Sequence, residues 1–219
     1  MKVSKPHILV TRFLWLILGI TLVIIFSKFI LTPFRGGPTQ DKAQTLPVLG
    51  EIASLTLTRQ DGRSIDLAGL QGKIWIADFI FTHCAGPCPL MTARMSRLAK
   101  HFQGEPDIRF LSFSVDPDRD TPEVLSQYAA RYEADPQNWY FLTGDKKTLH
   151  EFIQKNFRLG VTEVPLEERE GEDQTVSHST KFVLVDRHLK LRGYYDTQDK
   201  GQMDRLIEDA EMLLKRQVS

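Results

Sequence analysis

The sequence predicts a mixed α/β domain, in which a sheet of parallel and antiparallel strands is flanked by helices. Strands and helices alternate between residues 73 and 156, which is the pattern of parallel strands joined by helical crossovers. A strand pair and a last helix follow between residues 181 and 216, and a hairpin contributes antiparallel strands. We therefore predict one α/β domain over residues 51–219, on the carboxyl side of a separate apolar segment.

That apolar segment is predicted to be a single transmembrane helix. Residues 13–31 are almost entirely apolar, and a helix of about 20 such residues spans a bilayer. The residues before it include Lys2, Lys5 and Arg12. The positive-inside rule then predicts a cytoplasmic N-terminus over residues 1–12 and a membrane anchor over residues 13–32. A cleaved signal peptide is the alternative, but it needs a shorter apolar core and a small-x-small cleavage site, which this segment lacks.

The anchor places the domain outside the cytoplasm. Residues 33–50 combine prolines, glycines and polar residues, which is the composition of a flexible linker reaching roughly 25 Å. An Arg-rich, acid-poor presequence does not precede the anchor, so we expect the bacterial inner membrane, with the domain in the periplasm. Lys and Arg together number 28 and so do Asp and Glu, and this balance argues against a nucleic-acid partner.

The first half of the domain supplies the central strands. Residues 54–58 and 64–67 flank Asp61-Gly62, a hairpin turn signal. Residues 73–81 form a nearly continuous apolar run, which suits a strand buried on both faces. Residues 90–102 carry apolar side chains at helical spacing, and residues 108–115 are a second buried strand.

The second half predicts the remaining elements. Thr121-Pro122-Glu123 has the pattern of a helix start. The later elements are predicted as a strand over 140–142, a helix over 146–156, a polar acidic loop over 161–175, strands over 181–185 and 189–195, and a helix over 202–216. The acidic loop is most simply a solvated face, and docking of a basic partner is the alternative.

Two cysteines, Cys84 and Cys88, carry the chemistry of the sequence. A disulfide between them would close a very small loop and stabilise little, so a reactive or metal-binding pair is the better interpretation. They lie where a central strand leads into a helix, at the sheet edge where ligands bind in open α/β folds. A helix N-terminus is expected to lower the pKa of a thiol, and a thiolate is both a nucleophile and a soft metal ligand.

Histidine is the natural third ligand for a soft dithiolate site. Four of the histidines, His7, His101, His150 and His188, lie before the anchor, on helices in solvated stretches or in a hairpin turn, and His83 is too close to Cys84 to point the same way. His178, just before the strand over residues 181–185, is the remaining candidate. Local sequence alone leaves a structural role for His178 open.

Three ordered motifs resemble the SCO/SenC family. They are Phe81-Thr-His-Cys-Ala-Gly-Pro-Cys-Pro, the run from Ser114 to Pro122, and His178-Ser followed by residues 182–186, and the similarity covers residues 51–215. The resemblance implies a thioredoxin-like fold and a copper site whose ligands are Cys84, Cys88 and His178. It also implies a role in assembling the dinuclear copper centre of cytochrome c oxidase.

The resemblance implies two related chemical functions and two kinds of partner. A copper metallochaperone is the first hypothesis, and a thiol–disulfide oxidoreductase that reduces the cysteines of the copper site is the second. A peroxidase or redox sensor is a weaker third, because no polarising cluster is evident. The implied partners are the copper-centre subunit of the oxidase and another copper carrier or thioredoxin-like protein.

Two features around the cysteines stay open. Many family members have a Pro and an acidic residue between the cysteines, whereas this chain has Ala85-Gly86-Pro87, and the missing charge should favour thiolate slightly. The motif over residues 116–122 has a structural interpretation, with Asp120 or Thr121 as a helix cap and Arg119 pairing locally. In the functional interpretation, Asp116 and Asp120 lie near the copper ligands and tune them or dock a partner.

Overall fold

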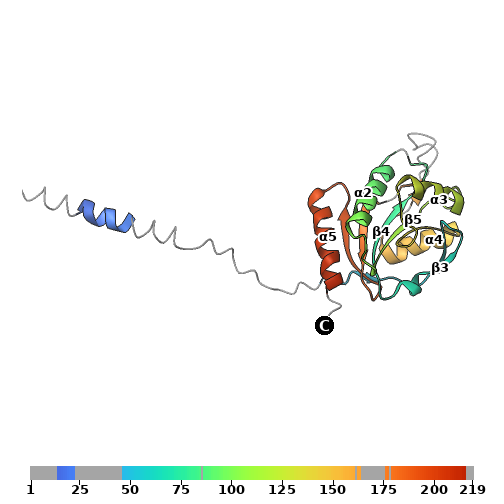
Figure 1. The fold of residues 1–219 in the computed structure, drawn as a ribbon, viewed down its shortest axis with the longest axis horizontal. Helices are drawn as coiled ribbons and strands as arrows, with labels where there is room; N and C mark the ends of the chain where they lie inside the picture. The colour runs from blue at the N-terminus through green and yellow to red at the C-terminus, as the bar shows by residue number, and fades with distance from the viewer. Residues whose placement is uncertain are drawn as a thin grey trace, which may run out of the picture. The chain divides into compact units, whose positions relative to one another are not determined.

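The computed structural model describes residues 14–22, 46–84, 86–160, 162–163, 176–177 and 179–215 (Figure 1). The chain divides into two compact units, residues 1–45 and 46–219. In the first unit, residues 14–22 form a helix. No helix in the described ranges combines the length and the apolar character that crossing a membrane requires. Much of the predicted anchor and linker lies outside the described residues.

An eight-stranded mixed sheet forms the centre of the second unit, in the order β1-β10-β9-β4-β5-β6-β2-β3. Its parallel part consists of β4 (Ile74–Ile80), β5 (Ile108–Ser114) and β6 (Trp139–Thr143). The antiparallel strands are β1 (Gly50–Glu51), β2 (Thr56–Arg59), β3 (Ser64–Asp66), β9 (Lys181–Val185) and β10 (Lys190–Asp196). The predicted α/β class and mixed sheet are confirmed.

Apolar character explains which strands are central. Every residue of β4 is buried, as the continuous apolar run predicts for a strand covered on both faces. The hairpin of β2 and β3 turns at Gly62, which has a φ of +77°. A glycine meets that requirement without steric cost, because it has no Cβ.

Helices cover both faces of the sheet. They are α2 (Cys88–His101), α3 (Pro122–Arg131), α4 (Lys146–Phe152), the π-helical segment Ile153–Phe157 and α5 (Lys200–Lys215), with a 3-10 turn at Leu67–Leu70. Phe152 and Phe157 make ring contacts with Phe113, so α4 and the π segment lie on the face to which Phe113 points.

The opposite face carries α2 and α3. Successive side chains of a strand point to opposite faces, so Ser112 faces away from Phe113. Phe141 pairs with Ser112 in the sheet, and the ring of Tyr128 on α3 packs edge-on against Phe141. Thr92 on α2 and the Tyr128 hydroxyl lie 2.9 Å apart in a buried hydrogen bond, which joins the two helices.

The structure differs from the prediction at three helix and loop boundaries. The first helix begins at Cys88 rather than at residue 90. The predicted helix over 146–156 is α-helical only to Phe152 and then widens into the π segment, which ends at Arg158 in the left-handed conformation, with a φ of 51°. Within the predicted acidic loop lies β7 (Thr162–Glu163), which pairs with β8 (Val176–Ser177) directly after the loop.

Candidate functional site

The carboxyl ends of β4 and β5 place two loops side by side. Ile80 and Ser114 are partners in the parallel register, and the Val115 amide donates to the Ile80 carbonyl at 2.8 Å. The loop that follows β4 contains Cys84, and the loop that follows β5 contains Asp116 and Asp120. The fold therefore brings the first two sequence motifs to one edge of the sheet.

Asp120 joins these two loops. Its side chain is fully buried and accepts hydrogen bonds from the Thr82 hydroxyl at 2.6 Å and from the Ser114 hydroxyl at 2.6 Å. The Thr82 amide donates to the same carboxylate at 3.2 Å. Burial raises the pKa of Asp120, although its bonds to Ser114 and Thr82 oppose that shift. Asp120 therefore fixes the backbone two residues before Cys84.

Thr121, rather than Asp120, caps α3. The Thr121 side chain accepts a hydrogen bond from the Val124 amide, as an N-cap residue does. Asp116 is nearly buried and forms an ion pair with Arg119 at 2.5 Å. The local pairing of Arg119 fits the structural interpretation of this motif. Asp120 does not act as the helix cap of that interpretation, because its side chain accepts hydrogen bonds from Thr82 in the segment that leads to the cysteines.

The two cysteines differ in exposure. Cys84 is half-buried, whereas Cys88 is fully buried as the first residue of α2, and both are thiols. Gly86 lies against the first sulfur, since a Cβ at this glycine would be 3.8 Å from Cys84 Sγ. Thr92 donates to the Cys88 carbonyl at 2.9 Å. The pair thus has one sulfur accessible from outside and one held inside the domain.

The pKa of Cys88 corrects the expectation of an acidic thiol at the helix start. A hydrogen bond with the Cys84 side chain and burial raise the pKa of Cys88 far above its usual value. A backbone hydrogen bond at Phe81 acts in the opposite direction but is the weaker influence. The stabilisation of thiolate by a helix N-terminus is outweighed here, because the thiol is desolvated and shares a hydrogen bond with its neighbour.

Asp78 is a residue of this site that the sequence interpretation missed. It is fully buried in the middle of β4, and its negative charge contributes to raising the pKa of Cys88. Asp78 and Phe79 are adjacent in β4, so their side chains point to opposite faces of the sheet. Phe79 contacts Phe157 on the face that α4 covers, so Asp78 points to the face that α2 covers. The signal was present, since Asp78 is the one charged residue inside an otherwise apolar strand and buried ionisable groups concentrate at functional sites.

Replacing Asp78 by asparagine is expected to lower the pKa of Cys88, because the change removes a negative charge while keeping the shape of the side chain. Thiolate absorbance, followed against pH in the reduced and metal-free chain, measures the shift. Asp118→Asn is the matched control, since this carboxylate is 65% exposed and pairs with Lys146. An unchanged titration in Asp78→Asn would show that the carboxylate does not act on the thiol.

The predicted third ligand, His178, lies outside the described residues, as does the acidic stretch over residues 167–173. Thr180 and β9 follow His178 in the chain, and β9 pairs with β4 in antiparallel register, with Ala77 opposite Val183. The start of β9 is therefore at the same sheet edge as the cysteine loop. In the described part of the chain, no group of three or more His, Cys, Asp and Glu side chains is arranged to hold a metal ion.

The other histidines of the domain have separate roles. His83, His101 and His188 are all exposed, and Nδ1 of His83 lies 3.1 Å from the Thr82 hydroxyl. His150 is a correction to the sequence interpretation, because it is half-buried rather than solvated. Its Nε2 lies 2.7 Å from the Val115 carbonyl, so it supports the loop after β5.

Comparison with known proteins shows the family of this chain. Residues 49–215 match the SCO1/SenC family model. The chain is 39% identical over 167 residues to the SCO1 protein homolog of Bacillus subtilis, which covers 75% of this chain and 83% of that protein.

Solved structures agree in fold. BsSco, described as a member of the Sco family of cytochrome c oxidase assembly proteins, superimposes with a TM-score of 0.63 at 38% identity, over 75% of this chain and 94% of that chain. Yeast Sco1 with copper bound superimposes with a TM-score of 0.59 at 25% identity, over 75% and 90% of the two chains. These matches confirm the thioredoxin-like fold, and the chain belongs to the SCO1/SenC family.

Proposed function

We propose that this chain is a membrane-anchored copper metallochaperone for assembly of the cytochrome c oxidase copper centre. Its family includes BsSco, which is described as an oxidase assembly protein, and yeast Sco1, which was solved with copper bound. Cys84, Cys88 and His178 would bind the copper as cargo. The predicted anchor over residues 13–32 would hold the domain on the periplasmic side of the inner membrane, within reach of the copper-centre subunit.

One observation carries the proposal: a dithiol is held at the end of β4, at the edge where β9 begins. Two sulfurs and one imidazole nitrogen are soft ligands of the kind that suit Cu(I). Asp120 fixes the segment that leads to Cys84, and Thr180 fixes the start of β9 by accepting from the Thr197 hydroxyl at 2.7 Å. The chemistry of the donor set thus fits copper, and the described segments next to the proposed ligands are held by hydrogen bonds.

The two cysteines differ in how they would hold and release a bound copper ion. Cys84 is half-buried, so an incoming ligand from a partner can reach it, whereas Cys88 is shielded by the domain. Binding releases the thiol protons, since thiolate is the metal ligand. The raised pKa of Cys88 therefore opposes spontaneous ionisation of the empty site and keeps that thiol protonated until copper arrives.

Copper binding by the reduced full-length chain in detergent tests the proposal. We expect one copper per chain, with binding lost in Cys84→Ser and Cys88→Ser and strongly weakened in His178→Ala. His188→Ala is the matched control, because this histidine is exposed in a hairpin turn and should leave copper binding unchanged. Loss of binding in the two cysteine variants and strong weakening in His178→Ala, with normal binding in His188→Ala, would support the two-sulfur, one-nitrogen site.

A thiol–disulfide oxidoreductase is the second candidate, and the unequal exposure of the cysteines favours it. In that reaction Cys84 would attack a partner disulfide and Cys88 would resolve the mixed disulfide, so two thiols become one disulfide as the partner is reduced. This chemistry needs no imidazole ligand. Undiminished copper binding in His178→Ala, or none in the unmodified chain, would contradict the proposed ligands and leave dithiol exchange as the function.

A further inference from the structure

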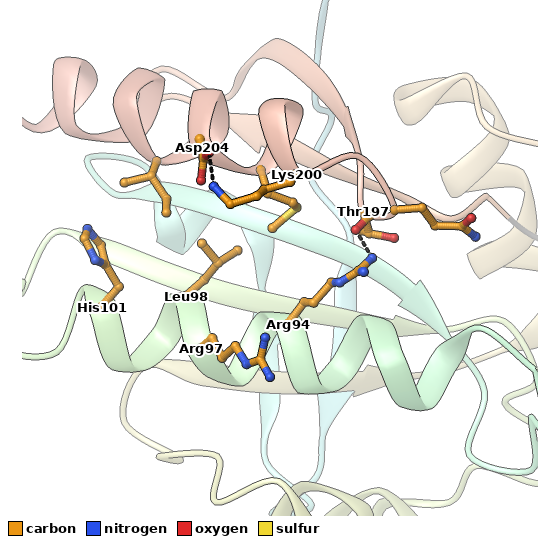
Figure 2. Close-up of a pocket in the computed structure, with 10 residues that line it drawn as sticks. Arg94, Arg97, Leu98, His101, Thr197, Lys200 and Asp204 are labelled. Carbon is orange, nitrogen blue, oxygen red and sulfur yellow. Dashed lines mark hydrogen bonds and ion pairs between the residues drawn. The ribbon is translucent and has the colours of Figure 1, made fainter.

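A groove runs between α2 and α5, and neither cysteine lines it. Its volume is about 440 Å³, and Figure 2 shows side chains of α2 on one wall and of α5 on the other. Leu98, Met203 and Ile207 contribute apolar surface to it. A groove with an apolar base between two helices can receive an extended or helical peptide.

The rim of the groove is basic. Arg94, Arg97 and His101 come from α2, and Lys200 comes from α5 opposite them (Figure 2). Asp204 is the one carboxylate that lines it, and it pairs with Lys200 at 2.6 Å. His101 lies 3.4 Å from Glu211. The whole chain has as many acidic as basic residues, so this excess of positive charge is local.

Two guanidinium groups, those of Arg94 and Arg97, lie in the groove. Arg94 donates to the Thr197 carbonyl, which is a neutral acceptor. Arg97 is exposed, and among the residues that the structure describes no carboxylate is within ion-pair distance of either arginine. An occupant that brings carboxylates would therefore gain charge-assisted hydrogen bonds that the domain itself does not satisfy.

The groove and Cys88 share α2. Leu90, Arg94, Arg97 and His101 follow one another at spacings of four, three and four residues, so they lie along one side of the helix. Arg94 is six residues beyond Cys88, about 9 Å along the helix axis. Leu90 is 52% exposed and lies one helical turn from Arg94 on the side of Cys88, so it offers apolar surface between the groove and the cysteine.

We propose that the α2–α5 groove docks an acidic, amphipathic peptide segment of the protein that exchanges copper with the dithiol. This assignment of the partner rests on the proposed function. Carboxylates of the segment pair with Arg94 and Arg97, its apolar side chains contact Leu98 and Met203, and Leu90 guides the partner toward Cys84. Opposite charges of this kind raise the association rate and fix the docking register. A flat lipid surface fits less well, because the cations line a concave groove.

The test uses the full-length chain in neutral detergent and a fluorescein-labelled peptide of alternating glutamates and leucines. We expect fluorescence anisotropy to show binding that weakens with salt and that falls about tenfold in Arg97→Glu. Arg63→Glu is the matched control, since Arg63 is 81% exposed on the β2–β3 turn and should leave peptide binding unchanged. A glutamine-for-glutamate version of the peptide should bind much more weakly.

Equal binding of the peptide to Arg97→Glu and to the unmodified chain, or no binding at all, would overturn the proposal. Micelles containing phosphatidylglycerol supply the lipid alternative: if they bind in an Arg97-dependent way and the peptide does not, the groove recognises lipid instead. Copper occupancy, measured on each sample, distinguishes failure of the groove proposal from failure of the proposed copper function. Copper binding without peptide binding contradicts only the groove, and peptide binding without copper binding contradicts the exchange partner.

Discussion

Replacing Asp120 by alanine is expected to lower the free energy of unfolding by about 3 kcal/mol, because it leaves buried donors without their charged acceptor. The Thr82 hydroxyl, the Thr82 amide and the Ser114 hydroxyl all donate to this carboxylate. Urea unfolding can be followed by the fluorescence of Trp75 and Trp139, which are fully buried. The same variant should weaken copper binding, since Thr82 lies two residues before Cys84.

Two variants make the Asp120 result specific. Asp120→Asn keeps the shape and part of the hydrogen bonding, so its loss of stability should be about 1 kcal/mol. Thr121→Ala removes only the cap of α3, which is also worth about 1 kcal/mol, and should not change copper binding. If Asp120→Ala cost no more stability than Thr121→Ala, the link between the two loops would not be a major support of the site.

Alkaline pH is expected to destabilise the reduced, metal-free protein through Cys88. A thiol in the unfolded chain has a pKa of about 8.5, whereas the pKa of Cys88 in the folded chain is raised. Between these two values the folded state holds more protons than the unfolded state, so stability falls as pH rises. The slope is roughly 1.4 kcal/mol per pH unit for one thiol.

The measurement is the free energy of unfolding between about pH 8.5 and 10, the interval between the thiol and tyrosine reference values. Burial also raises the pKa of Tyr128, Tyr194 and Tyr195, so these tyrosines add to the slope as the pH approaches 10. Comparison with Cys88→Ser, which keeps all three tyrosines, isolates the contribution of the thiol. In Cys88→Ser the slope should be much smaller, because the serine hydroxyl does not titrate there. An equal slope in the variant would mean that another group causes the alkaline loss of stability.

Local sequence pattern is enough to predict most of the strands and helices of the domain. Residues 181–185 are predicted as a strand and β9 spans Lys181–Val185, because a short run of apolar residues ends at the turn over residues 186–188. The β1 strand was not predicted, since two residues carry no periodicity, and its pairing with β10 joins distant parts of the chain. Helical spacing also does not predict the π segment, because the position of Phe157 depends on its ring contacts with Phe79 and Phe113.

The candidate site was predicted in part. The position of Cys84 and Cys88 between a strand and a helix follows from the apolar run and the proline after it. The role of Asp120 could not be decided, because its partner Thr82 becomes a neighbour only through the parallel pairing of β4 and β5. The pKa of Cys88 was predicted in the wrong direction, since burial depends on tertiary packing.

The position of β9 in the sheet has a consequence for the order of folding. β9 pairs with β10 on one side and with β4 on the other, although it comes far later in the chain than β4. Until that late hairpin arrives, β4 is an edge strand, and pairings between distant segments form slowly. The cysteine loop and the segment after His178 come together only when this step is complete. A chain that emerges N-terminus first therefore completes last the sheet edge at which the proposed copper ligands meet.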